Sequence, residues 1–375
     1  MVIPYALFSP SELFPISRTV DLYDHFLFVS AIGIFSAAIF TIGRATANLI
    51  QNKLFCFRYD CTPIHFRLYS SILWVSIFAH LLAIAMAGPG FLTGGFIEAR
   101  DSGLISGIGI PMRLYLLVIP WIISSNSLRK LRRELTLLFI LILLRSIIFS
   151  ERLAIFEFLI GVWFYYYITK TQPKFVNFVK VIGIALVGFS LLQAARMATI
   201  SGVDEKMIGI ADVGPIDTIL AYYGDVQNKA YKIFFDNFRY AETSYDAIIR
   251  KTNDLGFSEP GAQDRFFFNG LFENRNFVSS LNNPGGLAQD INDFDGYLGI
   301  VILGLKIYAF SFFIYSARRT PTFQPLAILS VISVLEYPRF NYLYLPYGVA
   351  LVWCATTIII LHWYLSKNSA KRSKK

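Results

Sequence analysis

Long apolar runs separated by short charged segments dominate the chain. A helix rises about 1.5 Å per residue, so runs of roughly 20 residues can cross a hydrocarbon core of about 30 Å. The expected spans are residues 25–43, 68–87, 111–125, two within 135–168, 179–195, 297–316, 323–335 and 347–364. The pattern predicts an all-α polytopic membrane protein with about nine to eleven spans.

The run 135–168 is too long for one span. As a single helix its 34 residues would extend to about 50 Å. Basic residues precede and follow it, which is typical of two cytoplasmic ends. We therefore predict a hairpin of two short helices that turns at residues 150–152 near the outer leaflet. Ionisable groups at that depth are costly and mark a candidate functional site. They are Arg145, Glu151, Arg152 and Glu157.

The distribution of Lys and Arg predicts the orientation. The short segments on one side carry 18 of these residues and those on the other side carry 4. By the positive-inside rule the C-terminus is cytoplasmic, the N-terminus is outside and the long polar segment is periplasmic. The expected parts are residues 1–196 (spans one to six), 197–296 (a large periplasmic loop), 297–366 (spans seven to nine) and 367–375 (a basic cytoplasmic tail).

Composition narrows the class further. The chain is 55% hydrophobic and 16% charged, and its formal net charge is +9. Because the basic residues lie in short segments between apolar runs, they encode topology and do not indicate a nucleic-acid partner. The start lacks a basic region followed by a small-residue cleavage site, so no cleaved signal peptide is expected. The three cysteines are expected to be unpaired thiols.

Arginines predicted on the outer side are the first candidates for chemistry. Arg145 and Arg152 lie seven residues apart, Arg196 ends span six, and Arg339 lies in the turn between spans eight and nine. The planar guanidinium suits phosphate or pyrophosphate because it donates paired hydrogen bonds and stays charged. The alternative is that Arg152 snorkels and pairs with Glu151, and that Arg196 is an interfacial anchor.

The large outer loop offers a second set of candidates. Its first half, residues 216–250, interleaves aromatic side chains such as Tyr222 and Tyr223 with charges. These aromatic rings could stack on sugars or pack on lipid. We also expect Arg265 to contact substrate. The loop contains no histidine, so a general base there would have to be Asp or Glu.

The end of this loop, residues 282–299, is rich in Asn, Asp and Gly. Asn292, Asp293 and Asp295 could cap span seven, and the two aspartates are candidate substrate contacts. The DxD pattern suggests a metal motif of nucleotide-sugar transferases, but its predicted periplasmic side and failed EF-hand spacing argue against a metal. Lys306, within span seven, faces either the headgroups or the bundle interior.

In organisation the chain resembles the Wzy-type polymerases of O-antigen or capsule repeat units of bacteria, over about residues 25–365. The resemblance rests on the hairpin LILLRSIIFSERLAIFEFLIG, on Arg196 leading into one large outer loop, and on the return NNPGGLAQDINDFDGYLGIVILG. The chain departs from many members in having fewer spans. Related O-antigen ligases use a histidine in the outer loop, and its absence here favours a polymerase.

The resemblance implies a GT-C-like helix bundle in the bacterial inner membrane and a polyprenyl-pyrophosphate-linked oligosaccharide as substrate. The growing glycan would pass from one lipid carrier to a new lipid-linked repeat unit on the periplasmic face. Arg145, Arg152 and Arg196 would stabilise the departing pyrophosphate, and Glu151 or Glu157 would accept a proton. No cofactor or metal is expected, and a chain-length regulator in the membrane is a plausible partner.

Two other classes stay open. A transporter or flippase of an anionic lipid-linked or small substrate would also use buried arginines, but the chain lacks two similar halves and has one long loop on one side. A membrane-bound acyltransferase would use a buried histidine. His80 is the intramembrane candidate, and His25 and His362 lie near span ends.

Overall fold

The described residues of the computed structural model form helices, with no strand among them. They are residues 22–54, 63–87, 108–125, 128–148, 152–169, 230–231, 233–235, 285–294, 296–318, 320–337, 342 and 346–372. The elements are α2 (Leu22–Leu54), α3 (Pro63–Ala87), α6 (Gly109–Arg113), α7 (Tyr115–Ser124), α8 (Arg132–Ile148), α9 (Arg152–Thr169), α15 (Gly286–Phe294), α16 (Tyr297–Ser316), η4 (Pro321–Phe323), α17 (Gln324–Glu336) and α18 (Pro346–Arg372).

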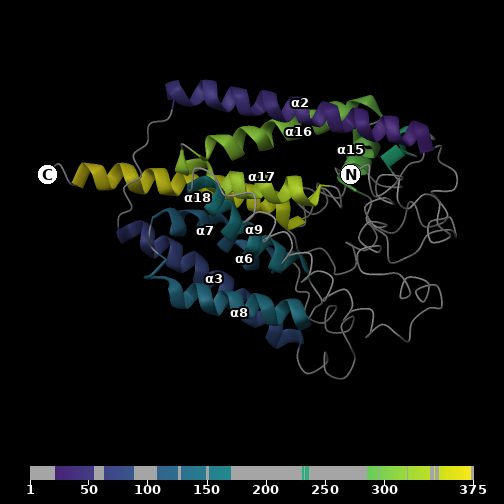
Figure 1. The fold of residues 1–375 in the computed structure, drawn as a ribbon. Coiled ribbons are helices and arrows are strands. Elements are labelled where there is room, and N and C mark those ends of the chain that lie inside the picture. The colour runs from purple at the N-terminus through teal and green to yellow at the C-terminus, as the bar shows by residue number, and fades with distance from the viewer. Residues whose placement is uncertain are drawn as a thin grey trace. The chain divides into compact units, whose positions relative to one another are not determined.

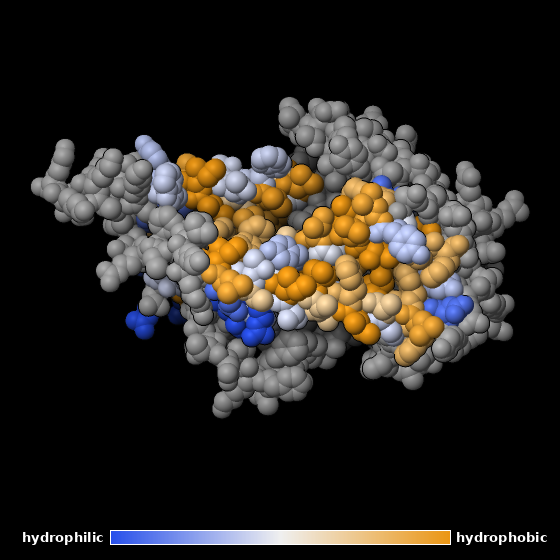
Figure 2. Space-filling view, turned by 90° about the horizontal axis from the view of Figure 1, so that it is seen from above, coloured by the Kyte–Doolittle hydropathy of each residue, from blue (hydrophilic) through white to orange (hydrophobic). Residues whose placement is uncertain are grey.

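Four of these helices contain segments long and apolar enough to cross a membrane, namely Phe26–Ile50, His65–Met86, Tyr297–Ser316 and Gly348–Leu365. Shorter apolar helices occupy Gly109–Ser124, Ala154–Trp163 and Pro321–Glu336. On the face seen in Figure 2, hydrophobic residues cover much of the described surface. Apolar side chains in such numbers on the outside of helices are typical of contact with lipid, and they identify a helical membrane protein with several candidate spans.

Several predicted span boundaries are confirmed. Residues 297–316 coincide with α16, and α3 ends at Ala87, directly before a Gly-Pro-Gly sequence that cannot continue a helix. The long run 135–168 is divided as expected, because α8 ends at Ile148 and α9 begins at Arg152. These two helices pack on each other. The predicted span 179–195 lies outside the described residues.

Two predicted ends are wrong. Helix α2 continues to Leu54, well past residue 43, so Arg44 belongs to a helix and not to a loop. The residues from Arg44 to Leu54 include neither Gly nor Pro, so nothing local stops the helix. Helix α18 likewise runs to Arg372 into the predicted tail, whose Lys, Ala and Arg residues are good helix formers.

Predicted span three is two helices, α6 and α7, and a side chain explains the interruption between them. The hydroxyl of Ser76 in α3 donates to the carbonyl of Pro111 (2.9 Å) and accepts from the backbone N–H of Tyr115 (3.1 Å). In a continuous helix that N–H would bond that carbonyl directly. Ser76 is therefore inserted into the hydrogen-bond ladder, which is a recognised cause of local helix distortion.

Contacts divide the chain into two units, which we describe separately. Unit 1 comprises Met1–Gly43, Gln193–Ala309 and Ser333–Pro346, and unit 2 comprises Arg44–Leu192, Phe310–Ile332 and Tyr347–Lys375. In unit 2, α3 lies along α8 and also contacts α6 and α7, while α7 packs on α9 (Figure 1). Almost every residue of α7 is buried, so α7 is the central helix of this unit.

One end of α7 in unit 2 is held by an aromatic group from three helices. The ring of His362 (α18) stacks on that of His65 (α3) with centroids 4.3 Å apart, and its Nε2 lies 3.2 Å from the hydroxyl of Tyr69. The indole N–H of Trp121 (α7) donates to the carbonyl of Pro321 (2.7 Å). These polar ring atoms are satisfied by protein groups inside the unit, as a water-free interior requires.

In unit 1, α15 packs on the first turns of α16 with almost no space between the backbones. A Cβ atom placed on Gly299 would lie 2.5 Å from the carbonyl oxygen of Asp290. The N–H of Gly286 donates to the carbonyl of Tyr337 (2.9 Å). Phe28 of α2 packs with Tyr231, Ile233, Ala288 and Ile291 in an apolar cluster. Because the backbone of α15 comes this close to residue 299 of α16, the packing of these two helices requires glycine there.

Replacing Gly299 by alanine should destabilise unit 1. The new methyl group would meet backbone atoms of α15 that cannot move aside, and overpacking of this kind costs about 1–3 kcal/mol. Gly33→Ala is the matched control, because nothing lies within 4 Å of its Cβ position. Thermal unfolding of the purified protein in detergent measures both variants. Equal unfolding temperatures for the two would contradict the close approach.

Candidate functional site

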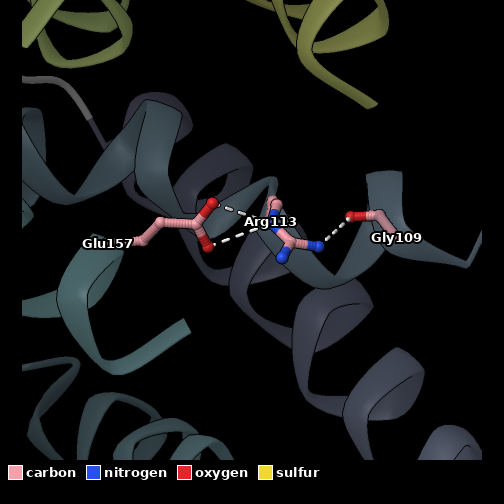
Figure 3. Close-up of polar contacts among 3 residues, drawn as sticks. All are labelled: Gly109, Arg113 and Glu157. Atoms are coloured by element: carbon pink, nitrogen blue, oxygen red, sulfur yellow. Dashed lines mark hydrogen bonds and ion pairs between the residues drawn. The ribbon is translucent and has the colours of Figure 1, made fainter. Parts of the chain in front are cut away.

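A buried ion pair joins α6 to α9 in unit 2. The Nε–H of Arg113 donates to both carboxylate oxygens of Glu157, each at 2.9 Å, and Nη1 donates to the carbonyl of Gly109 at 3.4 Å (Figure 3). Arg113 is 3% exposed and Glu157 is 0% exposed. Figure 3 shows the guanidinium between the carboxylate and the carbonyl. Both oxygens of Glu157 are therefore engaged by the same arginine.

Helix periodicity places both partners. Arg113 ends α6, and its bond to Gly109 spans one helical turn. Glu157 shares the buried face of α9 with Ala154 and Ile160, at spacings of three residues. A Cβ atom placed on Gly161, one turn later, would lie 3.7 and 3.4 Å from the side chains of Ile119 and Ile328, so this face of α9 packs on apolar side chains. The apolar face of α9 thus carries the carboxylate into the interior.

Arg145 brings a second guanidinium to the interior of unit 2. It lies in the last turn of α8 and is 6% exposed. It is close enough to His80 of α3 and Tyr115 of α7 to interact with both electrostatically, and Arg113 and Glu157 also interact with Tyr115. The rings of His80 and Tyr115 have centroids 6.3 Å apart. Arg145, which the sequence predicts in the hairpin, therefore shares the neighbour Tyr115 with the Arg113–Glu157 pair.

On α3, α7 and α8 of this unit, three further polar atoms are buried without a hydrogen-bond partner among the described residues: Nε2 of His80 and the hydroxyls of Tyr115 and Ser146. Nδ1 of His80 lies 2.8 Å from the carbonyl of Ser76. Because a carbonyl only accepts, Nδ1 is the donor and Nε2 of the neutral ring is an acceptor. A buried polar atom without a partner costs about 1–3 kcal/mol, so these atoms suit a polar ligand.

We call five of these residues the polar cluster: His80, Arg113, Tyr115, Arg145 and Glu157. They come from five helices, α3, α6, α7, α8 and α9. Under the predicted topology all of them lie in the outer halves of their spans. The cluster combines two guanidinium groups and the hydroxyl of Tyr115, which are donors suited to the oxygens of a phosphate or pyrophosphate. The acceptor nitrogen of His80 would instead face a donor such as a substrate hydroxyl.

Unit 1 contains a different buried charge centre. The side chain of Asp290 in α15 is fully buried and accepts from the ammonium of Lys306 in α16. Its second oxygen accepts from the hydroxyl of Tyr337 at 2.6 Å. Asp293, one turn further along α15, also interacts electrostatically with Lys306. The structure thus places Lys306 in the interior of unit 1 and not among the headgroups.

The predicted site residues divide into four groups. Arg145 and Glu157 are brought together in the polar cluster. Asp293 and Asn292 lie in the last turns of α15, so the expectation that they cap span seven is wrong; the polar residues 286–294 form a helix of their own. Arg152 begins α9, but its side chain is not described. The remaining predictions lie outside the described residues: Glu151, Arg196, Tyr222, Tyr223, Arg265, Asp295 and Arg339.

Sequence reasoning missed some members of both centres. Arg113 lies inside an apolar run, so the rule that selected Arg145 would also have selected it. His80 was considered only as an acyltransferase base. Tyr115, Asp290 and Tyr337 carry no distinguishing pattern, because a hydroxyl or carboxylate gains its significance from partners distant in the chain. Among the described residues, no group of three or more His, Cys, Asp or Glu side chains could hold a metal.

Comparison with known proteins finds no matching family model, no similar curated protein and no similar solved structure. Function therefore has to be inferred from the chemistry of the residues themselves.

The Arg113–Glu157 pair should behave as a coupled unit. Arg113→Gln leaves the carboxylate of Glu157 buried without its cation, and loss of one partner of such a pair costs about 3–5 kcal/mol. Arg113→Gln/Glu157→Gln removes both charges and should recover most of that loss. Denaturant unfolding in detergent measures the free energy of unfolding of the single and double variants. Arg133→Gln, which changes an exposed arginine, is the control. Additive losses in the double variant would show that the two side chains do not depend on each other.

The two partners of Asp290 should differ in their contributions. Lys306→Met removes the positive charge beside a fully buried carboxylate and should cost about 3–5 kcal/mol. Tyr337→Phe removes one hydrogen bond to that carboxylate and should cost about 1–3 kcal/mol. Thermal unfolding in detergent ranks the variants. A Tyr337→Phe loss as large as that of Lys306→Met would argue against a dominant ion pair.

Proposed function

We propose that this chain polymerises lipid-linked oligosaccharide repeat units on the outer face of a bacterial inner membrane. The growing glycan is transferred from polyprenyl pyrophosphate to a new lipid-linked repeat unit. The observation that carries the proposal is the convergence of Arg113 and Arg145 with two buried polar atoms, Nε2 of His80 and the hydroxyl of Tyr115, that have no hydrogen-bond partner among the described residues. The sequence resemblance to Wzy-type polymerases and the predicted outer location of these residues support it.

The chemistry requires stabilisation of a departing pyrophosphate. An acceptor hydroxyl attacks the anomeric carbon of the donor sugar while the bond from that carbon to the pyrophosphate oxygen breaks. Negative charge develops on the pyrophosphate, and preorganised donors in a water-poor site stabilise such charge strongly. We assign this role to Arg145, with Arg152 and Arg196 as further contributors. The lipid pyrophosphate leaves without a nucleotide or a metal ion.

Glu157 is better suited to positioning than to proton transfer. Both of its oxygens accept from Arg113, so it holds that guanidinium toward the cluster. The proton of the attacking hydroxyl needs another acceptor. Within the polar cluster, Nε2 of His80 is a buried acceptor without a partner among the described residues. We therefore propose His80 for this step, beside Glu151 of the hairpin.

Activity can be tested with the purified protein and a lipid-linked repeat unit, without added nucleotide or metal. The expected product is a ladder of lengthened glycans. Arg145→Gln should lower the rate by about 10²–10³-fold, the usual effect of removing one donor to a developing oxyanion. Arg133→Gln, an exposed arginine outside the cluster, should keep the ladder. A full ladder from Arg145→Gln would refute the site, and no ladder from the unaltered protein would refute the function.

A transporter of an anionic lipid or solute is the second candidate, and the Asp290–Lys306 pair favours it. Buried ion pairs within membrane helices mark ion pathways and proton relays in many transporters. Transport predicts that the purified chain in vesicles moves the lipid-linked repeat unit between leaflets without lengthening it. Lengthening without transport would exclude this candidate.

A further inference from the structure

Ser76 lies on the buried face of α3 and is 0% exposed. Its hydroxyl donates to the carbonyl of Pro111 at 2.9 Å and accepts from the backbone N–H of Tyr115 at 3.1 Å. Its own carbonyl accepts from Nδ1 of His80 at 2.8 Å, one helical turn later. Ser76 therefore contacts two members of the polar cluster directly, and a third member, Arg113, lies in the segment that its hydroxyl bridges.

The hydroxyl of Ser76 keeps the turn between α6 and α7 open. In a regular helix the N–H of Tyr115 would bond directly to the carbonyl of Pro111 at about 3 Å. The inserted hydroxyl holds these two groups farther apart, and the same carbonyl accepts from the N–H of Leu114 at 3.4 Å. Arg113 is the last residue of α6, directly before this turn. The direction in which Arg113 leaves the backbone therefore depends on the turn that Ser76 maintains.

The guanidinium of Arg113 requires an accurate position because it has several partners. Its Nε–H donates to both oxygens of Glu157, each at 2.9 Å, and its charge also acts on His80 and Tyr115 (Figure 3). A misplacement of about 1 Å in a catalytic site can lower a rate about 10²-fold. A change in the turn after Arg113 would therefore alter both the ion pair and the polar cluster.

Apolar contacts hold α6 on α3 independently of the hydroxyl. Ala79 and Ala83 of α3 form a buried cluster with Ile108 and Met112, directly before and within α6. Without the hydroxyl this cluster stays in place, and the N–H freed by its loss can bond directly to the carbonyl four residues earlier. A water-poor interior favours that bond, because an unpaired backbone group there is costly. Loss of the hydroxyl should therefore close the turn and redirect Arg113 without unfolding the unit.

We propose that the hydroxyl of Ser76 is a positioning group for the glycan transfer reaction. By keeping the turn between α6 and α7 open, it directs the guanidinium of Arg113 and the hydroxyl of Tyr115 to the site that His80 also faces. Ser76 acts through these residues and does not touch the substrate. Its role in the reaction rests on the proposed function, whereas its effect on the position of Arg113 does not.

The energetic coupling between Arg113 and Glu157 tests the position of Arg113 without an activity assay. Denaturant unfolding in detergent measures the cycle of Arg113→Gln and Glu157→Gln in the unaltered protein and in Ser76→Ala. With Ser76→Ala the coupling, expressed as a ratio of unfolding equilibrium constants, should be about tenfold smaller, a change within the range for directly contacting groups. Ser71→Ala, which changes an exposed serine of α3, should leave the coupling unchanged. Equal coupling in all three backgrounds would refute the role of Ser76, because a hydroxyl that only satisfies the backbone would not alter it.

Lengthening of a lipid-linked repeat unit by the purified full chain tests the role in the reaction. Ser76→Ala should lower kcat by about 10–10²-fold and leave KM nearly unchanged, because the misplaced groups act on the transition state. Ser76→Thr keeps the hydroxyl and should restore most of kcat, and Ser71→Ala should match the unaltered protein.

Other outcomes would overturn the positioning role. Equal losses of kcat from Ser76→Ala and Ser76→Thr would assign the effect to packing. Failure of Ser76→Ala to fold would show that the hydroxyl is required for the fold itself. A full rate from Ser76→Ala would refute the positioning role alone, whereas no ladder from the unaltered protein would refute the proposed function. In that last case the coupling measurement still decides whether Ser76 sets the position of Arg113.

Discussion

The bond between Arg113 and Glu157 illustrates the constraint on which the structure depends: a polar group inside a membrane bundle must find its partner within the protein. Water cannot solvate a charge there, so an isolated guanidinium or carboxylate would be costly. The pair meets this requirement by joining a short helix to a neighbour. Ser76 meets the same requirement for the backbone, since its hydroxyl bridges the interruption between α6 and α7. The division of predicted span three into α6 and α7 thus follows from its contact with the hydroxyl of Ser76.

Unit 1 meets the constraint in a different way. Asp290 is carried by a nine-residue helix and accepts hydrogen bonds from Lys306 and Tyr337, one on each oxygen. Gly299 allows the helix backbones to come close enough for this arrangement. Both units therefore bury a carboxylate on a helix and pair it with a cation from another. In unit 2 the cation belongs to a cluster that holds buried polar atoms without a partner among the described residues, which is why chemistry is proposed there and not at Asp290.

Much of the helical pattern could be predicted from the sequence, because apolar length and breaker residues act locally. The division of residues 135–168 and the limits of α16 follow from these signals. The rule that intramembrane charges are functional candidates selected Arg145 and Glu157. Arg113 meets the same criterion, since it also lies within an apolar run. The sequence predicts a loop over residues 286–294, because their many polar side chains conceal a helix with one buried face.

By itself, the sequence determined which segments are apolar enough to enter a membrane and predicted which ends face the cytoplasm. Both depend on composition along the chain, which needs no knowledge of neighbours. Only the tertiary structure decided the partners of the buried groups. A helix period of 3.6 residues tells which side chains share a face, but not which helix lies opposite that face. That is why Lys306 had two possible environments in the sequence and one in the structure. For the same reason, the long hairpin's Arg145 acquired its neighbours His80 and Tyr115 only after folding.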